Sequence, residues 1–174
     1  MEQDHGTKVA LVTGGGTGIG RAISLALARH RSSVAVVYSR SDDDANATVA
    51  DIVRAGGAAI ALKADVTDPA AVRAAVVTTV ERFGGLDYLV NNAGITRQLP
   101  FADLEAIEDD MWDQLFATNV KGAFLFSRAA AAHLRDRPGG AIVNVGSIAG
   151  ETGYGSSIPY AVSKSAMHGL TKSL

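Results

Sequence analysis

The chain has 174 residues, of which 47% are hydrophobic, so one domain with a sizeable core is expected. Its 16 basic and 18 acidic residues give a net charge of −2, which offers no electrostatic basis for binding nucleic acid or an anionic membrane. Cysteine is absent, which excludes disulfides, thiolate catalysis and zinc–thiolate sites. No apolar run approaches the roughly 18 residues that span a bilayer, and the N-terminus is polar and acidic, unlike a signal peptide. We therefore expect a cytoplasmic protein.

Short β-rich runs alternate with longer helical stretches along the chain. The expected strands are near-continuous apolar runs, as in sheets that are covered on both faces: Val9–Val12, Val34–Tyr38, Ala59–Lys63, Tyr88–Asn91 and Ala141–Val145. The expected helices are Arg21–Arg29, Asp43–Ala55, Pro69–Arg82 and a long span from about Asp109 to Arg135. Asp68 before Pro69 is a helix-start signal, and the glycine pairs at 56–57, 84–85 and 139–140 lie where helices should stop.

Repeated strand–helix units of this kind predict an α/β fold, a doubly wound parallel sheet with right-handed crossovers. No linker or low-complexity tract divides the chain. We expect a flexible tail over residues 1–7 and one domain over residues 8–174.

The segment Thr13–Gly20 is rich in glycine and joins the first expected strand to the first expected helix. This arrangement aims backbone N–H groups and a helix N-terminus at a phosphate. Glycine permits the tight turn and a close approach of a pyrophosphate. The useful spacing is Gly14, Gly18 and Gly20, since no literal G-x-G-x-x-G is present. A flexible turn without a ligand is the alternative interpretation.

Tyr160 and Lys164 are four residues apart, a spacing that places both side chains on one face of a helix. An ammonium group beside a phenol favours the phenolate and lowers a pKa that is normally about 10, which makes tyrosine a usable general acid/base near neutral pH. The hydroxyl of Ser147 could hold and polarise a carbonyl in front of that tyrosine. Tyrosine four residues before lysine is common by chance, so this spacing alone does not establish a site.

Together these segments resemble the short-chain dehydrogenase/reductase family. The family motif T-G-x-x-x-G-x-G matches residues 13–20, N-N-A-G matches residues 91–94, and Y-x-x-x-K matches residues 160–164. Ser147 matches the family serine, and Asn119 matches its further catalytic asparagine. The five motifs occur in the family's order, and the resemblance runs from about Lys8 to the last residue.

The resemblance implies a Rossmann-type fold and an oxidoreductase that transfers a hydride between a nicotinamide cofactor and a ketone or secondary alcohol. Tyr160 would donate or accept the proton, Lys164 would lower the tyrosine pKa and bind the nicotinamide ribose, and Ser147 would orient the carbonyl. Asn119, at a local kink of its helix, would position a water in a proton relay to Lys164. The implied cofactor-binding residues are Gly14, Thr17, Gly18, Ile19, Gly20, Ser39, Arg40, Asp65, Val66, Asn92, Ala93, Gly94, Tyr160 and Lys164.

The stretch after the second expected strand bears on cofactor choice. NAD-specific family members usually carry an acidic residue there, whereas here Tyr38 occupies the region and Arg40 follows, with no carboxylate before Asp42. Arginine suits a 2′-phosphate through bidentate, charge-assisted hydrogen bonds, so NADP(H) is favoured over NAD(H). Family members that use NADP commonly carry the basic residue one position earlier, at Ser39 here. A surface arginine facing Asp42–Asp44 is the alternative.

Family members continue through further strands and a substrate-covering loop, so the resemblance implies that this chain, ending at Leu174, is an N-terminal part with its fifth strand as a bare edge. The segments Asn91–Thr96, Thr118–Gly122 and Gly169–Leu174 look most like 3-oxoacyl-carrier-protein reductases, which makes a 3-oxoacyl thioester one candidate substrate. In the family, the helix that here holds Ala129–Ala132 and the helix of the Y-x-x-x-K motif form the subunit interface, so we expect a homodimer or homotetramer.

Two other functional classes stay open. A non-catalytic nucleotide-binding or interaction module would use the glycine turn without the catalytic residues. An epimerase or dehydratase with bound NAD is the other, although such relatives typically show the spacing T-G-x-x-G-x-x-G. The four histidines show no ligand-like spacing, so we predict no metal site.

Overall fold

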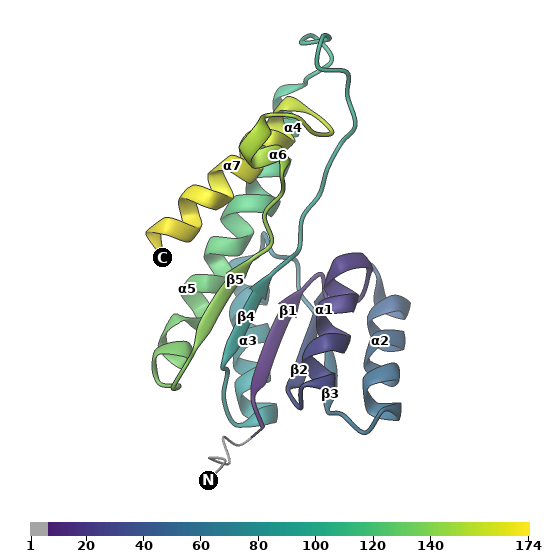
Figure 1. The fold of residues 1–174 in the computed structure, drawn as a ribbon, viewed down its shortest axis with the longest axis vertical. Helices are drawn as coiled ribbons and strands as arrows, with labels where there is room; N and C mark the ends of the chain where they lie inside the picture. The colour runs from purple at the N-terminus through teal and green to yellow at the C-terminus, as the bar shows by residue number, and fades with distance from the viewer. Residues whose placement is uncertain (1–6) are drawn as a thin grey trace.

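A single parallel sheet organises the computed structural model, which describes residues 7–174 (Figure 1). Apart from Thr7, the tail predicted over residues 1–7 lies outside the described residues. The five strands lie in the order β3-β2-β1-β4-β5, and every neighbouring pair is parallel. The strands are β1 (Val9–Thr13), β2 (Ser33–Tyr38), β3 (Ala59–Lys63), β4 (Tyr88–Asn91) and β5 (Ala141–Asn144).

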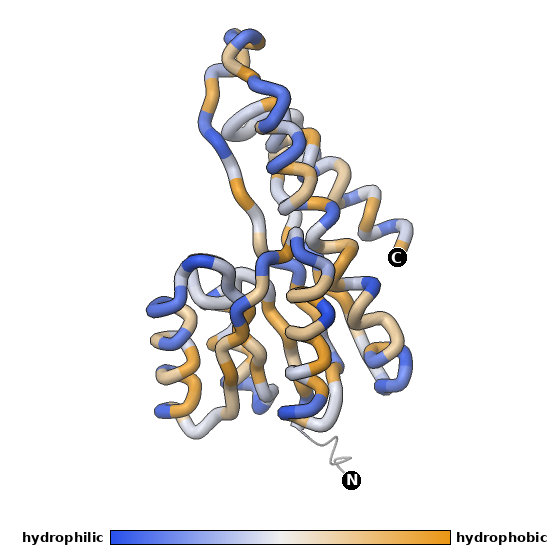
Figure 2. The backbone as a smooth tube through the Cα atoms, turned by 180° about the vertical axis from the view of Figure 1, so that it is seen from behind, coloured by the Kyte–Doolittle hydropathy of each residue, from blue (hydrophilic) through white to orange (hydrophobic). Residues whose placement is uncertain are grey.

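Helices cover both faces of the sheet, because each central strand is apolar on both of its faces. The α-helices are α1 (Gly18–Arg29), α2 (Asp42–Arg54), α3 (Pro69–Phe83), α4 (Asp109–Phe116), α5 (Gly122–Arg135), α6 (Ala149–Thr152) and α7 (Ile158–Ser173), and a π-helical turn, η1 (Ala117–Lys121), joins α4 to α5. Leu11 packs in one core with residues of α3 and α5, whereas its neighbour Val12 packs in a second core with residues of α1 and α2. Figure 2 shows the apolar character of the strands and the polar residues at helix ends and loops. The predicted doubly wound fold is confirmed.

Most predicted boundaries agree with the structure to within a few residues. α3 begins after Asp68, whose carboxylate accepts from the N–H groups of Ala70 (2.8 Å) and Ala71 (3.3 Å), and it ends at Gly84 in the left-handed conformation (φ 79°). α1 starts at Gly18 rather than at Arg21, because the glycine segment itself forms the first helical turn.

Three features differ from the sequence-based expectation or add to it. The long span from Asp109 to Arg135 is divided by the π-helical turn η1, which lies at the kink expected around Asn119. The short helix α6 was not predicted. Residues 95–108 form an irregular segment that extends beyond the carboxyl end of β4 (Figure 1).

Within residues 7–174, none of the helices combines the length and apolar character needed to cross a membrane.

Candidate active site

A cleft of about 620 Å³ opens at the carboxyl ends of the strands, where ligands bind in sheets of this type. Its walls come from the turns that follow β1, β2, β3 and β4, together with the end of α4 and the start of η1. Eight of the predicted cofactor-binding residues line it: Gly14, Thr17, Ser39, Arg40, Asp65, Val66, Ala93 and Gly94. The structure therefore brings together the glycine turn and the segments predicted to contact the adenosine half of a dinucleotide.

Glycine is required at two positions of the turn for different reasons. Gly14 has a positive φ of 61°, in the left-handed region that L side chains rarely adopt. At Gly20, in the first turn of α1, an added Cβ would overlap the carbonyl oxygen of Gly14 and approach the side-chain amide of Asn92. The turn is thus folded tightly onto itself and onto the end of β4. Gly18, Gly20 and Asn92 belong to this turn or contact it without lining the cleft. Of the other predicted cofactor-binding residues, Ile19, Tyr160 and Lys164 do not line the cleft.

Hydrogen bonds join the glycine turn to the segment after β4. The hydroxyl of Thr13 accepts from the backbone N–H groups of Asn92 and Ala93, both at 3.0 Å. The side-chain amide of Asn92 donates to the carbonyl oxygens of Thr13 (2.9 Å) and Gly14 (3.2 Å). A shift of the turn after β1 therefore also shifts the chain after β4, and the two segments form one wall of the cleft.

Arg40 and Asp65 lie on the same side of the cleft, at the ends of β2 and β3. The carboxylate of Asp65 accepts from the N–H and the hydroxyl of Thr67, both at 2.8 Å, and these bonds, together with the charge of Arg40, hold its pKa below the ordinary value of 3.8. Arg40 is exposed, as a surface arginine would be, and among the described residues it makes no ion pair with Asp42–Asp44. Its charge also acts on Asp65, a residue that lines the cleft.

Tyr160 and Lys164 lie one turn apart on α7, as their spacing predicts. The Nζ of Lys164 is 5.9 Å from the centroid of the Tyr160 ring and donates to the carbonyl oxygen of Val145 at 2.9 Å. Lys164 is buried, at 5% exposure. Burial lowers the pKa of Lys164 below its ordinary value of 10.5, because the charged form loses its hydration.

Asn119 holds α7 against the segment after β4. Its side chain is fully buried in η1; Oδ1 accepts from the N–H of Ile95 (2.8 Å), and Nδ2 donates to the carbonyl oxygen of Ile95 (3.0 Å) and to Oγ of Ser163 (3.0 Å). A Cβ added to Gly94 would lie 3.3 Å from Asn119 Oδ1 and 3.7 Å from Lys164 Nζ. The last residue of the N-N-A-G motif thus passes directly beside Asn119 and Lys164.

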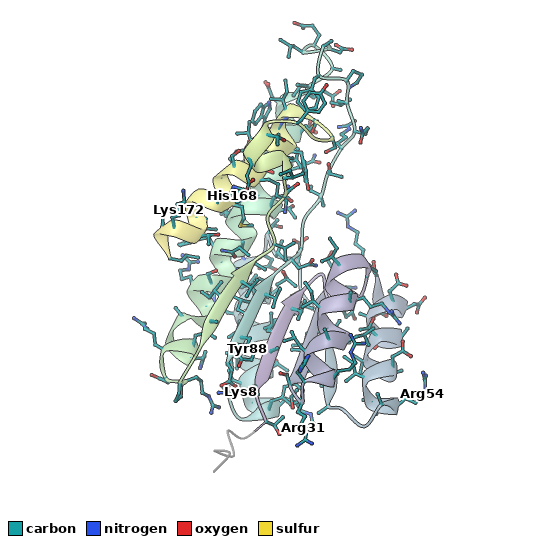
Figure 3. The ribbon with its side chains drawn as sticks, in the orientation of Figure 1. Lys8, Arg31, Arg54, Tyr88, His168 and Lys172 are labelled. Carbon is teal, nitrogen blue, oxygen red and sulfur yellow. The ribbon has the colours of Figure 1, made fainter. Side chains whose placement is uncertain are left out.

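Ser147 lies in the turn that follows β5, and its hydroxyl accepts from the N–H of Ala149 at 3.2 Å. In the described part of the chain no hydrogen bond joins Ser147 to Tyr160 or Lys164, although Lys164 bonds Val145, two residues before Ser147. His168, one turn beyond Lys164 on α7 (Figure 3), packs against Gly146, where an added Cβ would lie 2.9 Å from its Nε2.

Sequence reasoning missed residues that hold the site from behind. Ser163 donates to the carbonyl oxygen of Tyr160 at 2.8 Å and receives the bond from Asn119. The side-chain amide of Asn91 donates to Ser127 Oγ (3.1 Å) and to Asn144 Oδ1 (2.8 Å), which ties β4 to α5 and β5. A serine inside a helix and an asparagine at a strand end give no local signal for these roles, because their partners are distant in the sequence.

The sheet order, the glycine turn and the cleft beyond the strands define a nucleotide-binding protein of the Rossmann type. The chain belongs to the short chain dehydrogenase family, whose model matches residues 8–174. The family predicted from the motifs is therefore confirmed.

Individual relatives are similar over nearly the whole chain. A 3-oxoacyl-[acyl-carrier-protein] reductase from Staphylococcus aureus is 41% identical over 167 residues, which are 96% of this chain and 67% of that protein. The crystal structure of a short chain dehydrogenase from Burkholderia cenocepacia in complex with NADP superposes with a TM-score of 0.88 at 44% identity, over 95% of this chain and 66% of that one. A dehydrogenase/reductase from Sinorhizobium meliloti gives a TM-score of 0.89 at 41% identity, over 95% and 64% of the two chains. The chain spans 64–67% of the length of the curated relatives that it matches.

Proposed function

We propose that the protein is an oxidoreductase that transfers a hydride between NADP(H) and a ketone or secondary alcohol. One observation carries the proposal: Tyr160 and the buried Lys164 lie one turn apart on α7, and Gly94, which lines the cleft, passes beside Lys164 Nζ. The groups proposed to transfer the proton and the cleft proposed to hold the nucleotide would then lie at the same edge of the sheet.

The residues of the cleft fit a dinucleotide. The turn after β1 has no side chains at Gly14 and Gly16, which line the cleft, so its backbone could approach a pyrophosphate closely, and α1 begins directly after this turn. Asp65 would accept a hydrogen bond from the adenine amino group, and Arg40 would bind a 2′-phosphate. When bound, NADP(H) would supply or accept the hydride.

The chain's own residues would handle the proton and the carbonyl. In reduction, the phenol of Tyr160 gives its proton to the carbonyl oxygen, and in oxidation the phenolate takes it back. Ser147 donates its hydroxyl hydrogen to the same oxygen and so orients the substrate. Lys164 would bind the nicotinamide ribose, and its buried Nζ lies 5.9 Å from the centroid of the Tyr160 ring. Asn119 would position the water that links Lys164 to solvent.

The relatives suggest which ketones to test first. The Staphylococcus aureus protein is named a 3-oxoacyl-[acyl-carrier-protein] reductase, so a 3-oxoacyl thioester is one candidate substrate. The Burkholderia cenocepacia structure holds NADP, which agrees with the preference inferred from Arg40. A homodimeric or homotetrameric assembly and a cytoplasmic location stay predictions.

Cofactor binding and turnover test the proposal separately. NADPH and NADH are titrated by fluorescence against the wild type and Arg40→Ser; we expect NADPH to bind more tightly, and the variant to lose about tenfold for NADPH alone, as for one charged hydrogen-bonding partner. NADH preference in the wild type would overturn the role of Arg40 and keep the family.

Turnover of a panel of ketones with NADPH is then compared between the wild type and Tyr160→Phe. We expect a loss of at least about a hundredfold in kcat with an unchanged NADPH affinity. Tyr88→Phe on β4 serves as the matched control (Figure 3). Near-normal turnover by Tyr160→Phe would refute the mechanism, and NADPH binding without turnover of any ketone or alcohol would favour a non-catalytic nucleotide-binding module.

A further inference from the structure

Two loops beyond the carboxyl ends of β4 and β5 are joined into one unit. We call them the paired loops: residues 95–108 and residues 148–157. The N–H of Leu99 donates to the carbonyl oxygen of Ser156 at 2.7 Å, and the hydroxyls of Thr96 and Ser156 are hydrogen-bonded. Further out, the rings of Phe101 and Tyr154 stack with their centroids 5.1 Å apart and their planes only 5° apart. Backbone, hydroxyl and aromatic contacts therefore fix the two loops against each other.

The paired loops lie against the proposed catalytic tyrosine. A Cβ added to Gly155 would lie 3.4 Å from Cδ1 and 3.8 Å from Cε1 of Tyr160, so the backbone directly after Tyr154 lies on the Tyr160 ring. Ser147 immediately precedes the second loop, and Gly94 immediately precedes the first. A substrate whose carbonyl lies between Ser147 and Tyr160 thus meets the paired loops next.

The paired loops present apolar surface to the outside. Tyr154 is 76% exposed, Ile148 is 68% exposed and Leu104 is 63% exposed. Ile148 directly follows Ser147, and Tyr154 directly precedes the Gly155 backbone that lies on the Tyr160 ring, so two of these exposed side chains adjoin the site, as in surfaces that a ligand covers. The stack adds a specific shape, because a flat ring held parallel to its neighbour offers its other face to a third ring, and offset stacking adds to the energy of burial.

The charge of the paired loops argues against an anionic ligand. They carry four carboxylates, Asp103, Glu105, Glu108 and Glu151, against one cation, Arg97. That guanidinium lies 3.6 Å from the Glu108 carboxylate, so its charge is largely offset. The negative charge of the paired loops repels thioesters carried on phosphate-bearing groups and acidic carrier proteins, and it favours neutral ligands.

We propose that the paired loops form a specificity wall for ketones whose carbonyl carries an uncharged aromatic substituent, with Tyr154 and Phe101 as the specificity-determining residues. This inference rests on the proposed function and narrows its substrate class. The substituent lies along the exposed Tyr154 face while the carbonyl reaches Ser147 and Tyr160. Thioesters carried on phosphate-bearing groups become poor substrates of this chain, in contrast to what the name of the Staphylococcus aureus relative suggests.

Three methyl ketones, which differ only in the group on the other side of the carbonyl, test the specificity of the paired loops: acetophenone, 4-acetylbenzoate and 2-butanone. Acetoacetyl-coenzyme A serves as the anionic thioester. With NADPH, kcat/KM is expected to be highest for acetophenone. In Tyr154→Ala, the preference for acetophenone over 2-butanone should shrink by about three- to tenfold, the range expected for one aromatic pair, and mainly through KM. Tyr154→Phe keeps the ring and should keep the preference.

Val77→Ala, on an exposed position of α3 away from the loops, controls for unspecific effects, and thermal unfolding checks that each variant is folded. Equal or better turnover of 4-acetylbenzoate or the thioester, or a preference that survives in Tyr154→Ala, overturns the proposal. If NADPH binds but no ketone is turned over, the proposed function has failed on its own. Ligand-observed NMR then tests the specificity of the paired loops. Binding of acetophenone in preference to 4-acetylbenzoate, with the binding lost in Tyr154→Ala, supports the proposal. Equal binding of the two ketones contradicts it.

Discussion

Two helical glycines differ in the atoms that surround their Cα. Gly20 and Gly169 are both helical glycines, but only the first lies against other parts of the chain: a Cβ at Gly20 would overlap the carbonyl oxygen of Gly14, whereas a Cβ at Gly169 would meet nothing within 4 Å. Alanine raises helix propensity at both positions, so comparing the two substitutions separates the effect of steric crowding at Gly20 from that of helix propensity.

We expect Gly20→Ala to weaken NADPH binding by at least about tenfold and to destabilise the fold, because the turn after β1 must move away from β4 to admit the methyl group. Gly169→Ala should instead stabilise the protein by about 0.5–1 kcal/mol. Fluorescence titration and urea unfolding measure both effects. An unchanged NADPH affinity in Gly20→Ala would contradict the tight packing of the turn.

At this scale the sequence predicted the residues with a local signature and missed those defined by distant partners. Gly14 and Gly20 are expected because strand, turn and helix are contiguous, whereas the helical spacing of Tyr160 and Lys164 indicates a site only together with the family motifs. The bond from Asn119 to Ser163 joins residues 44 positions apart. No local pattern encodes such a contact, since it depends on how α7 packs against η1.

The first residues of α3 and α2 differ in whether a side chain caps the helix N-terminus. Asp68 accepts two backbone hydrogen bonds at the start of α3, whereas Ser41 makes no side-chain cap at the start of α2. We expect Asp68→Ala to lower the free energy of unfolding by about 1 kcal/mol and Ser41→Ala to change it by much less. Equal losses in urea unfolding would show that the cap contributes nothing specific.

A carboxylate between α1 and α2 makes stability depend on pH. Asp51 bonds Arg54 (2.7 Å) and Arg21 (2.6 Å), and these partners hold its pKa below the ordinary value of 3.8. Because the folded-state pKa is the lower one, the contribution is fully present above pH 3.8 and is lost as the pH falls through the folded-state value. Asp51→Asn should therefore unfold more easily than the wild type at pH 7, and thermal unfolding at decreasing pH should bring the two together. A constant difference down to pH 2 would contradict this linkage.

Elements were predicted well where packing follows sequence periodicity. The sheet strands are apolar on both faces, and their order in the chain alternates with helices, so fold class and strand positions could be read directly. α6 has only four residues, too few to show a period. Apart from α6 the paired loops have no regular structure, and contacts between them, such as the stack of Phe101 on Tyr154, form only once β4 and β5 lie side by side.

Within residues 7–174 the sheet has two edge strands, β3 and β5, each of which pairs on one side only. Among residues 7–174, β5 pairs with β4 only, and Val143 is 51% exposed. An open strand edge can pair with another chain, and a lysine on such a strand opposes that pairing. We expect Val143→Lys to reduce concentration-dependent association, measured by light scattering. Val77→Lys on α3 is the control for added charge alone, and an equal effect of both variants would show that the strand edge is not involved.

The bonds between the turn after β1, the segment after β4 and η1 have a consequence for amide exchange with solvent. The N–H groups of Asn92 and Ala93 donate to the hydroxyl of Thr13, and that of Ile95 donates to the side chain of Asn119. Although these amides belong to a loop, we expect them to exchange only when the segment after β4 separates from Thr13 or from η1. Their deuterium uptake should therefore be as slow as that of the β4 core. We therefore expect the amides of residues 92, 93 and 95 to become exposed to solvent only when the whole domain unfolds.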